Sequence, residues 1–152
     1  MKDDYVTYEQ AIILKELGFD WKCNHYYDTQ TKEFLPVDWF DYDGDVDADD
    51  LYDSNPPTGI ISYRVSAPTM AQVAKWLREI KNIIVNPYFD IWQNCNKYES
   101  YYYLLRDVPN PEIYMSIYEM RLVGDNFNTY EEALSAAIDE ALNFLKTKEI
   151  KS

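Results

Sequence analysis

The spacing of apolar residues changes at Ile83 from about 3.6 to 2, and this change constrains the fold of the 152-residue chain more than any other feature. Over 69–80 apolar residues recur every three or four positions, as in a helix. Beyond Ile83 they alternate over 83–94, 99–106 and 112–121, as in strands. Because short connections join these three strands, we expect them to pair antiparallel.

Three helices are predicted from capping boxes. In a capping box the threonine side chain at the start of the helix accepts from a backbone N–H three residues later, and the glutamine or glutamate side chain at that later position accepts from the threonine N–H. The pairs are Thr7 with Gln10, Thr69 with Gln72, and Thr129 with Glu132. An apolar stripe at helical spacing follows each pair. Gly18 is expected to end the first helix in a left-handed conformation. Gly124-Asp125-Asn126 is expected to turn the chain before the last helix.

A hairpin is predicted between the first two helices, where 26–28 and 33–35 flank a short polar connection. The resulting order is helix, hairpin, acidic loop, helix, three strands, helix. This order predicts an α+β fold in which helices pack on one face of an antiparallel sheet of three or more strands. The length predicts a single domain over 1–152 with an acidic loop at 38–56.

The segment 38–53 holds eight aspartates and no basic residue, so we expect a loop there. The whole chain has 27 acidic and 14 basic residues, a net charge of −13. Without the eight aspartates, 19 acidic and 14 basic residues remain, a net charge of −5. The acidic excess disfavours a general electrostatic affinity for nucleic acid or anionic lipid, and it favours a basic partner. Mimicry of DNA is a weaker alternative, because the body of the chain is only mildly acidic.

Alternating aspartates are also typical of loops that offer Ca²⁺ several oxygens. The candidate metal ligands are Asp41, Asp43, Asp45, Asp47 and Asp49. No register completes an EF-hand: a loop that starts at Asp41 has Val46 in place of the turning glycine and Tyr52 in place of the closing glutamate. We expect a solvated loop, with a weak cation site or docking on a basic partner as alternatives. No cofactor is predicted.

The sequence lacks the residues needed for a metal site with two histidines and for the nucleotide enzymes that bind phosphate with a glycine-rich loop. His25 is the only histidine, and the four glycines form no phosphate-binding loop. Cys23 and Cys95 are expected to be thiols that act as buried small apolar residues. No signal peptide is recognised, and no apolar stretch approaches the roughly 20 residues that cross a bilayer. We therefore expect a cytoplasmic protein that does not bind membranes.

Aromatic residues make up 16% of the chain and gather on the predicted strands. Alternation gives both faces of the sheet apolar side chains, although a sheet with one face in solvent normally alternates apolar with polar residues. One interpretation is that the hairpin and the acidic loop cover the second face. The alternative is a surface for a partner or a second copy. Its candidate residues are Tyr88, Trp92, Tyr102, Tyr114 and Tyr118.

Three sequence blocks resemble a group of small uncharacterised proteins from gut bacteria, their phages and other mobile elements. They are Val6-Thr7-Tyr8-Glu9 with Leu14 to Phe19, Ala67-Pro68-Thr69 with Trp76-Leu77-Arg78-Glu79, and Tyr130-Glu131-Glu132-Ala133-Leu134 with Glu140-Ala141-Leu142. The group has no assigned activity. The resemblance therefore implies a biological context but no site residue.

Together these features predict a non-enzymatic protein-binding or adaptor protein of a phage or mobile element that acts in the host cytosol. A homodimer through an exposed sheet face or edge is an equal alternative to a monomer. The enzymatic alternative is a reaction dependent on a divalent metal held by carboxylates such as Asp28, Glu33 or the aspartates of the acidic loop.

Overall fold

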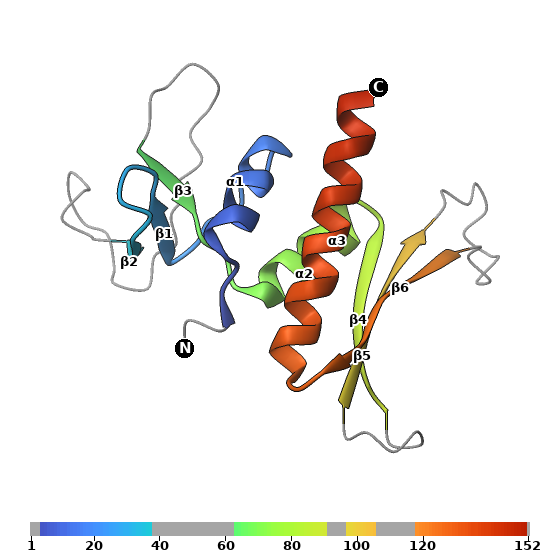
Figure 1. The fold of residues 1–152 in the computed structure, drawn as a ribbon. Coiled ribbons are helices and arrows are strands. Elements are labelled where there is room, and N and C mark those ends of the chain that lie inside the picture. The colour runs from blue at the N-terminus through green and yellow to red at the C-terminus, as the bar shows by residue number, and fades with distance from the viewer. Residues whose placement is uncertain (1–3, 38–62, 91–96, 106–117, 152) are drawn as a thin grey trace. The chain divides into compact units, whose positions relative to one another are not determined.

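The computed structural model describes residues 4–37, 63–90, 97–105 and 118–151 (Figure 1). These residues form three helices and two three-stranded antiparallel sheets, which confirms the predicted α+β class. The hairpin and the three later strands thus belong to separate sheets. The chain divides into two compact units, Met1–Thr69 and Met70–Ser152. The single domain over 1–152 stays a prediction, and the acidic loop at 38–56 lies outside the described residues.

The first unit contains one helix and a small sheet. Its elements are α1 (Tyr8–Glu16), β1 (His25–Asp28), β2 (Phe34–Pro36) and β3 (Arg64–Ser66), with the strand order β2-β1-β3. The predicted capping box of α1 is present: the Thr7 hydroxyl accepts from the Gln10 backbone N–H at 3.2 Å, and the Gln10 side chain accepts from the Thr7 N–H at 3.0 Å. Gly18 has a φ of 89°, as predicted for a left-handed stop.

Tyr27 of β1 links the small sheet to the segment before α1. Its ring is 4% exposed, and its hydroxyl donates to the Val6 carbonyl at 2.6 Å. Burial raises the pKa of Tyr27, with a further contribution from the charge of Glu9. The buried side of α1 adds Ala11 and Leu14, both fully buried. This unit therefore has an apolar core among its own elements.

The second unit contains two helices and a longer sheet. Its elements are α2 (Met70–Ile80), β4 (Ile83–Asp90), β5 (Lys97–Leu105), β6 (Tyr118–Phe127) and α3 (Tyr130–Lys151), with the strand order β4-β5-β6. The stripe predicted for the last helix is buried: Ala133, Leu134, Ala137, Ile138, Ala141, Leu142 and Leu145. In α2 the predicted stripe holds as far as Leu77. Ile80, at the end of α2, is wrong as a core residue because its side chain is 54% exposed.

The predicted turn at Gly124 is wrong, because β6 continues through it to Phe127. Gly124 pairs with Ser100 of β5, and the register shifts on both sides of this pair. Such bulges add residues to one strand without ending the pairing. A β-carbon at Gly124 would come within 2.9 Å of the Phe127 ring, so glycine suits the close approach. The third strand therefore extends to Phe127 and not only to 121, and residues 112–117 of the predicted strand lie outside the described residues.

Candidate interaction surface

One face of the β4-β5-β6 sheet lies under α3. Three side chains of β5 that share this face each contact the helix. The ring centroids of Tyr98 and Tyr130 lie 6.2 Å apart, and those of Tyr102 and Phe144 lie 6.4 Å apart. Between these two pairs, the Ser100 hydroxyl donates to the Ala133 carbonyl at 2.5 Å. Tyr102 is only 5% exposed and Ser100 is fully buried. We call this the covered face.

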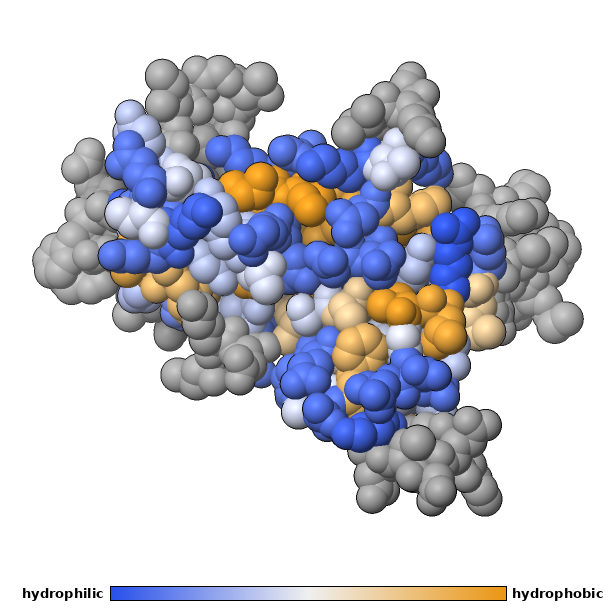
Figure 2. Space-filling model, in the orientation of Figure 1, coloured by the Kyte–Doolittle hydropathy of each residue, from blue (hydrophilic) through white to orange (hydrophobic). Residues whose placement is uncertain are grey.

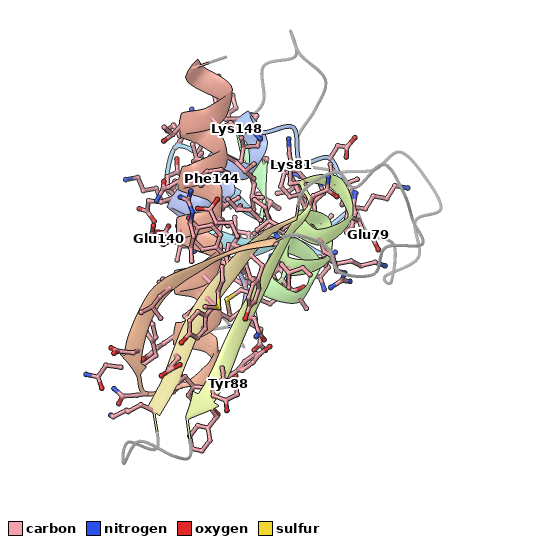
Figure 3. The ribbon with its side chains drawn as sticks, turned by 90° about the vertical axis from the view of Figure 1, so that its right-hand side faces the viewer. Glu79, Lys81, Tyr88, Glu140, Phe144 and Lys148 are labelled. Carbon is pink, nitrogen blue, oxygen red and sulfur yellow. The ribbon has the colours of Figure 1, made fainter. Side chains whose placement is uncertain are left out.

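The opposite face carries an apolar and aromatic group that we call the open face. Because residues paired across antiparallel strands point to the same side, the register defines its rows. The rows are Ile84 with Tyr103 and Met120, Asn86 with Tyr101 and Leu122, and Tyr88 with Glu99. Tyr88 is 48% exposed, and Met120 and Leu122 are each 58% exposed. Figure 3 shows the strands in front of α3, with Tyr88 near one end of the sheet.

Large exposed apolar side chains that gather on one face of a sheet are a feature of interaction sites. In the space-filling view, hydrophobic residues reach the surface over the strands of the second unit and are bordered by hydrophilic ones (Figure 2). On the covered face, by contrast, the guanidinium of Arg121 lies 5.1 Å from the centre of the Phe144 ring.

The structure places the predicted surface residues differently from one another. Tyr88 lies on the open face. Tyr102 does not: it pairs with Val85 and with Arg121, so it belongs to the covered face. Trp92 and Tyr114 lie outside the described residues, and Tyr118 is the first residue of β6.

Leu122 was absent from the sequence-based candidate set because the strand was predicted to end at 121. Gly124 suggested a turn, but it occupies a bulge, so the alternation that reaches Leu122 was not followed far enough. Met120 fell within the predicted strand, on the same side as Tyr118. A glycine that follows an alternating apolar run is equally compatible with a bulge, and that reading would have identified Leu122.

Both edge strands of this sheet are poorly suited to pairing with a further strand. β4 contains Pro87, which has no N–H to donate, and β6 contains the irregular register around Gly124. Proline and bulges are devices by which natural sheets avoid pairing at their edges. Pairing of a further strand at either edge of this sheet is therefore disfavoured.

A carboxylate and a phenol lie together on the open face. The Tyr101 hydroxyl donates to Glu99 Oε2 at 2.6 Å. This hydrogen bond, with desolvation and the charge of Glu99, raises the pKa of Tyr101 to about 12. Tyr101 is therefore a neutral donor at physiological pH, and Glu99 places a negative charge among aromatic rings. At the end of β5, Lys97 donates to the side chain of Asn128.

Two carboxylates of the enzymatic alternative, Asp28 and Glu33, lie in the hairpin of the first unit. Asp28 Oδ1 accepts from the backbone N–H groups of Gln30 at 2.8 Å and Thr31 at 3.1 Å. These backbone hydrogen bonds lower the pKa of Asp28. Asp28 therefore shapes the hairpin turn, as aspartates often do. Glu33 is exposed at the start of the returning strand.

No group of three or more His, Cys, Asp or Glu side chains that could hold a metal occurs among the residues that the structure describes. The candidate ligands Asp41, Asp43, Asp45, Asp47 and Asp49 lie outside those residues, so the weak cation site stays a prediction.

His25 forms part of an aromatic cluster in the first unit. Its ring stacks on Phe34 with centroids 4.6 Å apart and an angle of 2°. Its Nδ1 lies 2.9 Å from Asn24 Oδ1, which also accepts from the Tyr5 hydroxyl at 3.2 Å. Burial lowers the pKa of His25. Cys23 is fully buried, as predicted, and its thiol donates to the Trp21 carbonyl.

Comparison of the chain with protein-family models, with curated proteins and with solved structures finds no match. Within 4–37, 63–90, 97–105 and 118–151, none of the helices combines the length and the apolar character needed to cross a membrane.

Proposed function

We propose that the chain is a non-enzymatic protein-binding or adaptor protein whose partner docks on the open face of the β4-β5-β6 sheet. The observation that carries this proposal is the asymmetry of the sheet: α3 covers one apolar face, while Tyr88, Met120 and Leu122 remain exposed on the other. Following the sequence resemblance, the proposed setting is the host cytosol during the life of a phage or mobile element.

The composition of the open face supports protein binding over other functions. Aromatic rings with polar tips and flexible apolar side chains are enriched in the centres of protein interfaces. Full burial of one large apolar side chain contributes about 1.5–3 kcal/mol, so a few exposed anchors supply a useful part of a binding free energy. Among the described residues, the register gives this face one basic side chain, Lys97, whereas contact with nucleic acid requires several interleaved basic residues.

Affinity capture from a bacterial lysate tests the proposal with three forms of the full chain. The first is the wild type, the second carries Met120→Ser and Leu122→Ser, and the third carries Ile80→Ser. Ile80 is a matched control because it is an exposed apolar residue, at 54%, on α2 and not on the sheet. We expect proteins that the wild type and the control retain and the double variant loses. Identical protein profiles from all three forms would contradict the proposal.

A further inference from the structure

The dimensions of the open face match one α-helix. The outer strands of a three-stranded sheet lie about 10 Å apart, and a helix with its side chains is about 10–12 Å wide. The covered face of the same strands provides a precedent, because one helix, α3, reaches all three strands, while α2 contacts mainly β4 among them. A second helix on the opposite face would complete a three-layer arrangement around this sheet.

The rows of the open face also set the length of such a helix. Successive rows on one side of a strand are about 6.8 Å apart, so the three rows span about 14 Å. At 1.5 Å per residue this distance corresponds to about 9 helical residues, or about 12–14 with a half-turn at each end. Apolar side chains at i, i+3, i+4 and i+7 would follow the rows from Met120 to Tyr88.

Charge indicates the chemistry of the occupant. Glu99 lies in the third row, and its Oε2 accepts from Tyr101. Lys97 lies in the next row of the same face but donates to the Asn128 side chain, so the Glu99 carboxylate can pair with a cationic side chain of a partner. The whole chain carries a net charge of −13, of which eight charges come from the aspartates of 38–53, and this net charge repels a second copy and attracts a basic partner.

We propose that the occupant of the open face is a single amphipathic helix whose apolar stripe is flanked by lysine or arginine. This inference rests on the proposed function, because it names the kind of partner that the same face binds. The apolar stripe packs on Tyr88, Tyr101, Met120 and Leu122. A basic side chain beside the stripe pairs with Glu99.

Three synthetic peptides of 14 residues, acetylated and amidated at their ends, serve as probes. One contains leucine at i, i+3, i+4 and i+7 with lysine elsewhere. The second replaces every lysine by glutamate. The third has the leucine and lysine composition of the first, but its leucines alternate with lysines as in a strand. Fluorescence anisotropy of each labelled peptide with the full-length chain gives its Kd.

We expect the helical leucine–lysine peptide to bind at least tenfold more tightly than the other two. The double variant with Met120→Ser and Leu122→Ser keeps the net charge of the wild type, so a tenfold loss of binding isolates the apolar contact from general attraction. Glu99→Gln is expected to weaken the leucine–lysine peptide severalfold and to leave the leucine–glutamate peptide unchanged. Ile80→Ser is expected to bind like the wild type.

Unchanged binding to the double variant would overturn the inference, since the peptide would then be held by general charge attraction. A chain that sediments as a dimer, and as a monomer when it carries the double substitution, would overturn it in favour of a second copy. Absence of binding by all peptides, while the double variant still loses its lysate partners, would refute the basic helix and leave the proposed function standing. Identical lysate profiles would refute both.

Discussion

A comparison of Leu122→Ala on the open face of the β4-β5-β6 sheet with Leu142→Ala on α3 tests whether the open face is exposed in solution. Leu122 is 58% exposed, so Leu122→Ala removes apolar contacts from about two-fifths of the side chain. With about 1.5–3 kcal/mol for a fully buried leucine, the expected loss of stability is roughly 0.6–1.2 kcal/mol. Leu142 of α3 is fully buried, and Leu142→Ala is expected to cost about 2–5 kcal/mol, because a cavity remains.

Urea denaturation followed by circular dichroism measures both free energies of unfolding by linear extrapolation. The two changes delete the same atoms, so their difference reports burial at the two positions. We expect Leu142→Ala to cost at least about 1 kcal/mol more than Leu122→Ala. Equal losses would show that Leu122 is covered within the chain, as the sequence-based alternative of a covering hairpin and acidic loop requires. The proposed function would then lose its surface.

Three further measurements address individual side chains. Tyr27→Phe removes the donor to the buried Val6 carbonyl and is expected to cost about 1–2 kcal/mol in urea denaturation; a change within error would contradict a structural role for that hydrogen bond. Burial lowers the pKa of His25 in the folded chain, so the unfolded chain binds more protons and stability should fall as the pH drops below about 6.5. His25→Phe keeps a ring against Phe34 and should lose less stability than the wild type between pH 7.5 and 5.5, whereas parallel curves would refute the assignment. By ¹³C-tyrosine NMR, Tyr101 should remain protonated at pH 11, in keeping with its pKa of about 12, and a midpoint near 10 would contradict the 2.6 Å hydrogen bond.

Features set by neighbouring residues were predictable from the sequence. The capping box of Thr7 and Gln10 needs only positions three apart, and the structure contains both of its hydrogen bonds. The left-handed Gly18 and the buried stripe of α3 are equally local, because one helix period decides them. The α+β class follows from the order of these local patterns.

Features that depend on strand pairing were less predictable. Alternation divides Tyr101, Tyr102 and Tyr103 between two faces, but it does not say which face α3 covers. The packing of Phe144 on Tyr102 decides this, and the two residues are far apart in the sequence. Likewise, a glycine at position 124 is compatible with a turn and with a bulge, and only its pairing with Ser100 distinguishes the two.

The constraints on the second unit together favour a contact with a different molecule. Pro87 and the bulged register of β6 hinder pairing at the edges of the sheet, and α3 occupies one face. The remaining apolar surface is about one helix wide and three rows long, which is small beside the roughly 800 Å² that each partner contributes to a standard interface. Two copies joined through this face alone would bury little area and would bring together two net charges of −13. A basic partner avoids the charge repulsion, and its charge attraction adds to the free energy gained from the small apolar contact.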